Sequence, residues 1–314
     1  MSLPDCRVLR IHILFIMYRE DAMLNRRKFG FLTLAAFAGG TALPYRSRAA
    51  NANALSTLSD GHLELPSAFL VPEPTRLELG VKLDETLTPD CNVTVLRSET
   101  RLVLFDAGSG PNFMPTAGRL PASLDAAGIN PGDVTDVVFT HAHPDHIWGV
   151  VDDFDDPLFA NATHHVASDE WSFWRSDRAL SDLPEERHSF VAGARNRFAA
   201  IEETVSLFKP GDEPVPGVEA MAAFGHTPGH MAFIVHGGEP AMIVGDAISN
   251  DPISFLRPDL PWGADQDGDK GAETRMRLLD RAAGEGIRII GFHLPNGGIG
   301  HVEREGAAYR FVAI

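Results

Sequence analysis

Short apolar runs alternate along the chain with longer amphipathic segments. Runs rich in Val, Ile, Leu and Phe and bounded by Gly, Pro and Asp predict β-strands, at residues 92–96, 102–105, 134–140, 218–224, 231–235 and 241–244. Apolar positions at helical spacing predict α-helices, at residues 116–127, 168–176, 185–200 and 272–283. Because strands and helices are interleaved throughout, we expect an α+β fold in which helices cover the sheets.

The N-terminal segment has the features of a removable export signal. Arg26 and Arg27 precede an apolar, Gly- and Ala-rich run at residues 32–43, and small residues follow as far as Ala54. The pattern is similar to a twin-arginine signal and is too short for a comfortable membrane span. We therefore expect a leader at residues 1–54, with translation naturally starting at Met23, and one domain at residues 55–314. We expect the mature protein to be periplasmic or secreted.

Charge and cysteine content narrow the classes of function. The chain has a net charge of −16, and the part after Ala54 is more acidic still, with 19 basic and 40 acidic residues. Such a surface repels phosphate backbones and anionic lipids, so we expect neither a nucleic-acid partner nor stable membrane insertion. Cys91 is the only cysteine after the leader, so a disulfide or Cys-rich metal site within the domain is excluded. Any metal must be held by His and carboxylate groups.

One stretch concentrates such groups at the end of an apolar strand. Val137, Val138 and Phe139 lead into a loop with three His and one Asp within six residues, namely His141, His143, Asp145 and His146. Two His residues two positions apart can point to the same side, and the next Asp and His can reach a second point a few ångströms away. Imidazole and carboxylate are the ligands expected for zinc, with manganese or iron as alternatives. The loop therefore predicts two adjacent metal sites that need further donors.

Three downstream residues can supply the missing donors. His226 lies in a Gly-His-Thr-Pro-Gly-His segment, Asp246 follows the apolar run at 241–244, and His293 follows a second apolar run that begins at Ile289. Each lies at a turn or strand end, like His141. We expect these strand ends to converge on the His loop. His230 and His301 are close enough in sequence to support the site, whereas the remaining histidines fit a surface or hydrogen-bonded role better.

This ordered set of donors resembles the metallo-β-lactamase superfamily, from about Leu77 to the C-terminus. The resemblance implies a four-layer αββα sandwich with two metal ions at the edge between the sheets. It assigns His141, His143 and His226 to one ion, Asp145, His146 and His293 to the other, and Asp246 to both. Asp106 would orient the His loop from behind. The implied activity is hydrolysis by a metal-bridged hydroxide, and Asp145 or Asp246 could also transfer a proton.

Within the superfamily, the sequence narrows the substrate only in part. An Asp at position 246 excludes the β-lactamases that use a Cys ligand. Several stretches, such as those at 208–213 and 225–230, are similar to the branch that contains methyl parathion hydrolase, although Asn296 and Gly297 depart from that branch. The leading hypothesis is a hydrolase of small esters, lactones or aryl phosphotriesters. An acyl-homoserine-lactone lactonase is the alternative, weakened because such enzymes often place a Tyr near the metals and Tyr309 is the only Tyr after the leader.

Two further expectations concern the pocket and the partners. Aromatic residues could form flat apolar walls for a small-molecule substrate, and we select Trp171, Trp174, Phe190 and Phe113. The one protein partner expected is a second copy of the chain, in a homodimer. A non-catalytic metal-binding member of the fold is the alternative from a different class, and the complete donor set argues against it.

Overall fold

The computed structural model describes residues 53–314. The predicted export signal lies almost entirely outside this range and stays a prediction that cell fractionation would test. The first described strand, β1 (Asn53–His62), begins two residues before the predicted start of the domain at residue 55. Among residues 53–314, no helix combines the length and the hydropathy that crossing a membrane requires.

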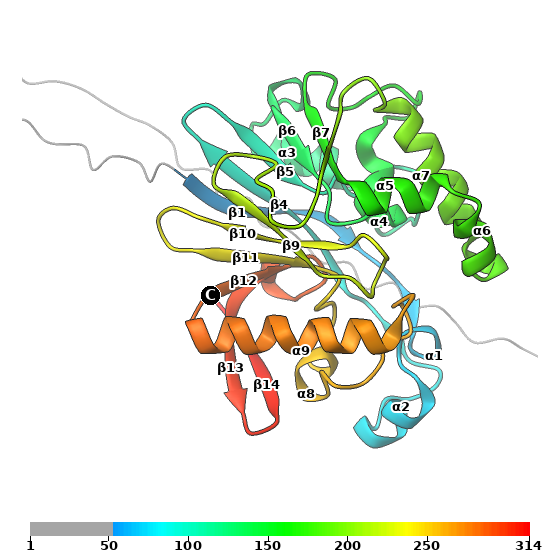
Figure 1. The fold of residues 1–314 in the computed structure, drawn as a ribbon. Helices are drawn as coiled ribbons and strands as arrows, with labels where there is room; N and C mark the ends of the chain where they lie inside the picture. Colours follow the sequence, from blue (N-terminus) through cyan, green and yellow to red (C-terminus); the bar gives the residue numbers. More distant parts are fainter. Residues whose placement is uncertain (1–52) are drawn as a thin grey trace, which may run out of the picture. The chain divides into compact units, whose positions relative to one another are not determined.

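The first of two six-stranded sheets contains the N-terminal strands and has the order β1-β4-β5-β6-β7-β8 (Figure 1). The pairs β1–β4 and β4–β5 are antiparallel, whereas the pairs β5–β6, β6–β7 and β7–β8 are parallel. Parallel strands end at one edge, which places the loops that follow β5 and β6 side by side. The other strands of this sheet are β4 (Asp90–Ser98), β5 (Leu102–Phe105), β6 (Asp136–Val138), β7 (Thr163–Ala167) and β8 (Val205–Phe208).

The second sheet has the order β14-β13-β12-β11-β10-β9. Strands β11 and β12 are parallel, so both end at the same edge, and the β9–β10 turn lies at that edge because β10 runs antiparallel to β9 and β11. Its strands are β9 (Val218–Ala222), β10 (Met231–Val235), β11 (Ala241–Gly245), β12 (Arg288–Gly291), β13 (Ile299–Glu305) and β14 (Ala308–Ala313). A separate pair, β2 (Leu65–Pro66) and β3 (Thr86–Leu87), forms a small sheet.

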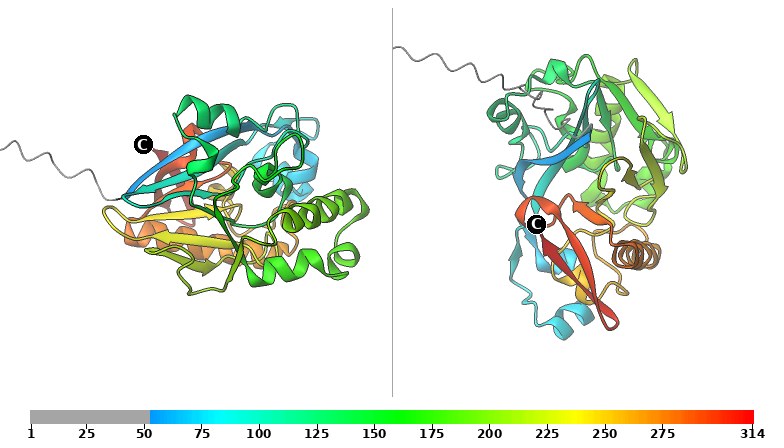
Figure 2. Two further views of the ribbon diagram at one scale, coloured as in Figure 1. Left: turned by 90° about the horizontal axis from the view of Figure 1, so that it is seen from above. Right: turned by 90° about the vertical axis from the view of Figure 1, so that its left-hand side faces the viewer.

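The two large sheets pack face to face, with helices on their outer sides (Figures 1 and 2). Between the sheets, Phe105 and Phe208 from the first sheet contact Phe233 from the second. The remaining elements are α1 (Ser67–Leu70), α2 (Glu73–Leu79), α3 (Leu120–Ala126), α4 (Pro144–Ile147), α5 (Ser168–Arg175), α6 (Arg178–Asp182), α7 (His188–Ala200), α8 (Ile253–Leu256) and α9 (Gly268–Glu285), with short 3₁₀ turns at η1 (Pro131–Asp133), η2 (Trp148–Val150), η3 (Glu185–Arg187) and η4 (Asn296–Gly298). The layers confirm the predicted αββα sandwich.

The strands that lead to the candidate site are buried on both faces. Every residue of β5, β6, β10 and β11 is buried, which explains why these strands read as continuous apolar runs rather than as alternating patterns. The predicted helix at 116–127 is shorter in the structure, because Gly118 adopts a positive φ of 73° and a turn precedes α3. The predicted helix at 272–283 is longer, because Asp267 caps it by accepting a hydrogen bond from the Lys270 amide.

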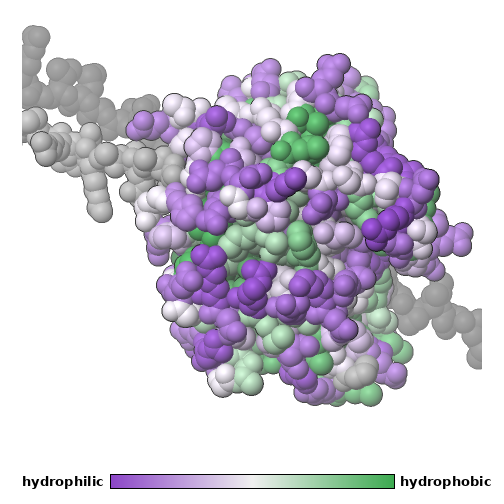
Figure 3. Space-filling view, viewed as in Figure 1, coloured by the Kyte–Doolittle hydropathy of each residue, from purple (hydrophilic) through white to green (hydrophobic). Residues whose placement is uncertain are grey.

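The face shown in Figure 3 is mostly hydrophilic, with hydrophobic residues in separate patches. This distribution is consistent with the acidic composition of the chain after residue 54.

His164 on β7 gives the fold an acid-sensitive position. Its Nδ1 lies 2.9 Å from Thr204 Oγ1, its ring stacks on Phe139, and its Nε2 is buried with no hydrogen-bond partner among residues 53–314. Burial, together with the neighbouring His165, lowers the pKa of His164 from 6.5 to about 4. The unfolded chain therefore binds this proton more readily, and stability falls as the pH falls from 6.5 towards 4.

We expect this one group to remove on the order of 3 kcal/mol of stability between neutral pH and pH 4. The measurement is urea unfolding from pH 7 to pH 4.5 for the wild type and for His164→Gln. The free energy of unfolding of the variant should depend less steeply on pH. Parallel curves for the two proteins would assign the acid sensitivity to other groups.

Candidate metal centre

The His loop follows β6 directly and belongs to the edge where the parallel strands end. His141 and His143 lie in the extended turn after the strand, and Asp145 and His146 lie in α4. The backbone of His143 is extended and precedes Pro144 at the first position of the helix, which is where Pro is best tolerated. The short helix α4 changes the direction of the chain. The extended segment and the helix therefore direct their four side chains towards the same side.

The second sheet supplies three more side chains at its facing edge. His226 lies in the β9–β10 turn, Asp246 directly follows β11, and His293 lies two residues after β12. Gly245 precedes Asp246 with φ 51°, and a Cβ at this position would lie 2.7 Å from His230 Nε2. Only Gly fits this bend without strain. The sequence pattern of an apolar strand, a Gly and an Asp thus has a direct steric reason.

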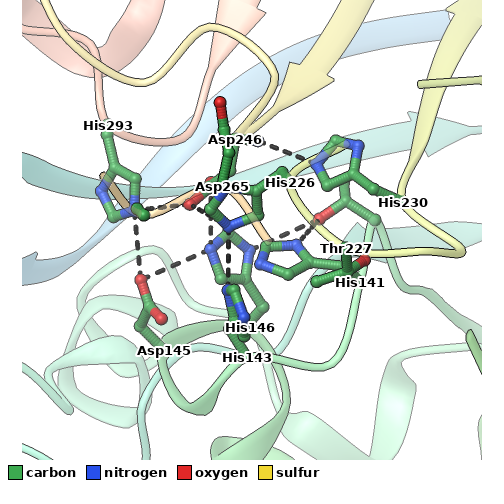
Figure 4. Close-up of polar contacts among 12 residues, drawn as sticks. His141, His143, Asp145, His146, His226, Thr227, His230, Asp246, Asp265 and His293 are labelled. Atoms are coloured by element: carbon green, nitrogen blue, oxygen red, sulfur yellow. Dashed lines mark hydrogen bonds and ion pairs between the residues drawn. The ribbon is translucent and has the colours of Figure 1, made fainter. Parts of the chain in front are cut away.

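The seven side chains converge as two adjacent groups (Figure 4). In each group one ligand atom from every residue lies within 4.8 Å of the others; the first group contains His141, His143 and His226, and the second contains Asp145, His146, Asp246 and His293. Asp246 contacts both groups, since its Oδ1 lies 3.2 Å from His146 Nε2 and its Oδ2 lies 3.3 Å from His226 Nε2. This is the geometry expected of a shared ligand.

Some donor atoms of the site pair with one another, such as His226 Nε2 with His143 Nδ1 at 2.8 Å, and others do not. The Nε2 atoms of His141, His143 and His146 are buried and have no hydrogen-bond partner among the described residues. Leaving a buried polar atom unpaired costs about 1–3 kcal/mol. Three such nitrogens facing two carboxylates form a donor set that divalent ions of the zinc type would satisfy.

Burial and charge set the protonation of the two groups differently. Burial, followed by the charges of neighbouring imidazoles, lowers the pKa values of His141 and His143 well below the ordinary range, so both rings are neutral. Burial also opposes ionisation of Asp246, but the adjacent His293, His146 and His226 outweigh it and hold the pKa of Asp246 low. In the second group the adjacent carboxylates, Asp246 first, outweigh burial and raise the pKa values of His146 and His293 well above the ordinary range. Neutral imidazole and ionised carboxylate are the forms that bind metals, so these two rings would release protons when ions bind.

Asp106, to which the family resemblance assigns the support of the His loop, contacts two residues of that loop. It follows β5 with a positive φ of 68°, unusual for a residue other than Gly, and this bend directs its carboxylate towards the loop. Asp106 Oδ2 lies 2.8 Å from His146 Nδ1, and Oδ1 accepts a hydrogen bond of 2.8 Å from the Thr140 amide. The contact fixes which ring nitrogen of His146 is free to face the other donors.

Three supporting contacts were not predicted in this form. His226 Nδ1 lies 3.0 Å from Asp265 Oδ1, and the other oxygen of Asp265 accepts from Arg275 at 2.8 Å. Asp265 lies in a loop without a recognisable motif, so the sequence gives no signal for it. His230, a predicted supporting residue, accepts a hydrogen bond of 3.0 Å from the Asp246 amide. His301 lies on β13 and makes none of these contacts.

A pocket opens beside the two groups, and His143, Asp145, His226, Asp246 and His293 contribute to its wall. The rest of the wall is mainly apolar and comes from segments that are distant in sequence; it includes Leu63, Leu65, Phe69, Leu70, Phe113, Phe190 and Trp262, with Arg187, Ser249 and Asn250 as polar members.

The four aromatic residues selected for the pocket lie in two different places. Phe113 and Phe190 line the pocket, but Trp171 and Trp174 do not. Trp174 is fully buried and donates a hydrogen bond of 2.6 Å to Glu170, while Trp171 packs on Phe198. Both indoles lie outside the pocket wall, which helical spacing alone does not reveal.

The fold and the paired donor groups are those of a known family. The family model of the metallo-beta-lactamase superfamily matches residues 88–292, and the chain belongs to this superfamily. Metallo-beta-lactamase domain-containing protein 1 of Xenopus laevis is 27% identical over 218 residues, which are 65% of this chain and 79% of the relative.

Two solved structures resemble the chain over most of its length. The hydrolase AbOPH has a TM-score of 0.76 at 26% identity, over 84% of this chain and 95% of its own. AidC, a dizinc quorum-quenching lactonase in complex with its product, has a TM-score of 0.76 at 27% identity, over the same shares of 84% and 95%. The branch of the superfamily that contains methyl parathion hydrolase stays a prediction.

Proposed function

We propose that the protein is a dinuclear metal-dependent hydrolase of small neutral esters, lactones or aryl phosphotriesters. The observation that carries this proposal is the position of the two donor groups, which lie side by side in the wall of an apolar pocket. Zinc is the metal proposed, with manganese or iron as alternatives, because imidazole and carboxylate are its usual ligands. The dizinc centre named for AidC supports this choice.

The seven donor residues would hold the two ions, and two of them can also accept a proton. Two divalent ions bound here would supply a nucleophile from water at neutral pH and polarise the oxygen of the bond under attack. His141, His143 and His226 would hold one ion, and Asp145, His146 and His293 the other. Asp246 would hold both, and its ionised carboxylate, like that of Asp145, can accept a proton during the reaction.

The pocket favours an uncharged substrate with an apolar arm. Its wall contains few polar groups besides the donors, and the guanidinium of Arg187 is already held by the backbone oxygens of Gly263 and Ala264 at 3.0 and 3.2 Å. Apolar walls with a small number of placed polar groups are typical of small-molecule sites. A large or highly charged substrate would leave its charges unpaired against this wall.

An acyl-homoserine-lactone lactonase is the second candidate. The similarity to AidC, whose structure contains N-hexanoyl-L-homoserine as product, favours it. Against it stands the absence of a Tyr from the described pocket wall, since Tyr309 lies on β14 and hydrogen-bonds to Asp280. The two candidates therefore need a direct comparison.

A substrate panel with metal content measured on the same sample tests the proposal. The panel contains an aryl phosphotriester, dihydrocoumarin, an aryl ester and N-hexanoyl homoserine lactone. Hydrolysis of the aryl substrates in preference to the last supports the first candidate, and the reverse preference supports the second. A protein that carries two metal ions and hydrolyses none of them would contradict both candidates.

Phe190 provides a test of the pocket itself. Its ring lies edge-on to His143 and to Phe113, with centroid distances of 5.9 and 6.1 Å. We expect Phe190→Ala to raise the KM for an aryl substrate about tenfold, since partial burial of a Phe ring is worth about 1–2 kcal/mol. Trp171→Ala is the matched control because Trp171 packs on Phe198 outside the pocket. Equal KM changes in the two variants would show that Phe190 does not contact the substrate.

A further inference from the structure

Glu170 is a buried acid on α5 that the sequence analysis did not select. Only 1% of its surface is exposed. Its Oε1 accepts hydrogen bonds from the Ala142 amide at 2.9 Å and the Trp174 indole at 2.6 Å. Its Oε2 accepts from the Thr227 hydroxyl at 2.7 Å and the Gly229 amide at 3.0 Å. One carboxylate thus receives four hydrogen bonds.

The four partners require an acceptor at both oxygens. The amides of Ala142 and Gly229 and the Trp174 indole can only donate. A Gln at position 170 would present a donating NH₂ group to one of these pairs, so at least one buried N–H would face another donor. A carboxyl group, which can accept at both oxygens, therefore satisfies both pairs. Burial raises the pKa of Glu170, and the four hydrogen bonds oppose that rise because they favour the charged form.

These contacts join the two loops that carry the three-histidine group. Ala142 lies between His141 and His143, and Thr227 and Gly229 follow His226. The loops also approach α5 closely, since a Cβ on Gly229 would lie 2.2 Å from the Glu170 amide nitrogen. Trp174, the fourth partner, packs edge-on against the His143 ring at a centroid distance of 5.7 Å.

We propose that Glu170 is a positioning residue that holds the His141–His143 loop and the His226 loop in register, and so sets the affinity of the three-histidine group for its cation. The second group depends on other supports, namely Asp106 behind His146 and the Asp90 carbonyl 2.7 Å from His293 Nδ1. Loss of Glu170 therefore weakens one of the two metal sites. This inference rests on the proposed binding of two metal ions.

The test is a zinc competition titration of the purified holoenzyme with a chromophoric chelator, which resolves two equivalents of metal without any substrate. In Glu170→Gln we expect one equivalent to bind about 10- to 100-fold more weakly, while the affinity of the other changes less than about threefold. Asp136→Asn is the matched control. Asp136 is equally buried on β6 and contacts Arg101 and His165 at the opposite end of the strand from the His loop. It should leave both equivalents unchanged.

Thr227→Val is a second, milder variant that can be measured if Glu170→Gln does not fold. It removes one of the four hydrogen bonds, and we expect the same equivalent to weaken about threefold to tenfold. Unchanged zinc affinity, or an equal loss at both equivalents, would overturn the role of Glu170 while leaving the proposed function intact. A wild-type protein that binds no zinc, manganese or iron would overturn the proposed function as well.

Discussion

Replacing Asp246 by Asn is expected to lower kcat/KM by at least about 10³-fold, because several kcal/mol of transition-state stabilisation depend on a correctly held pair of ions. The two oxygens of Asp246 lie 3.2 Å from His146 Nε2 and 3.3 Å from the Nε2 atoms of both His226 and His293. An amide keeps the shape of the side chain but loses the negative charge and one acceptor oxygen. The measurement combines kcat/KM on the best substrate of the panel with the metal content of the same sample.

The control for this variant is Asp136→Asn, which changes an equally buried Asp far from the donors. It should retain kcat/KM within about threefold of the wild type, as expected for a change that leaves the site intact. An Asp246→Asn protein that keeps two ions and full activity would show that the carboxylate is not shared between the groups.

Removal of the metal ions is expected to abolish activity and to lower the melting temperature by on the order of 10 °C. At a free metal concentration about 100 times the dissociation constant, each bound ion would stabilise the folded state by about 2.7 kcal/mol. The melting temperature of a domain of this size changes by about 2–4 °C for each kcal/mol. The structural reason is the set of buried Nε2 atoms of His141, His143 and His146, which make no hydrogen bond among the described residues. Differential scanning fluorimetry and an activity assay on the same samples measure both effects.

Zinc-saturated chelator is the control, because it adds the same compound without the capacity to remove zinc. Added zinc or manganese should restore both activity and melting temperature. Full activity in protein verified to be free of metal would contradict the proposed chemistry. An unchanged melting temperature would instead show that the donor groups are stable without ions.

The donors could be predicted from the sequence because each ends an apolar strand or lies in a turn. A strand buried on both faces is a continuous apolar run, and a polar residue directly after it is conspicuous; Asp246 after β11 is the clearest example. Residues that follow neighbouring parallel strands lie at the same edge of the sheet, because parallel strands end at the same edge. The meeting of the two sheets, by contrast, followed from the family resemblance and not from any pattern in the strands.

The supporting acids could not be predicted in this way. Asp265 and Glu170 carry no motif, and their roles depend on contacts with residues that are 39 and 59 positions away in sequence, as with Asp265 and His226 or Glu170 and Gly229. The same holds for the choice of tryptophans for the pocket. Trp262 lines the pocket, whereas Trp174 is buried against Glu170, and no local pattern distinguishes the two positions. Long-range packing decides these positions.

The location of the bound metals is the most direct test of the central claim. Crystals of the purified holoenzyme, measured at the absorption edge of the metal found in solution, would show the positions of the ions by anomalous scattering. We expect two peaks in each chain, one beside His141, His143 and His226 and the other beside Asp145, His146 and His293, with Asp246 next to both. A single peak, or none within reach of these side chains, would contradict the assignment of a two-metal hydrolase.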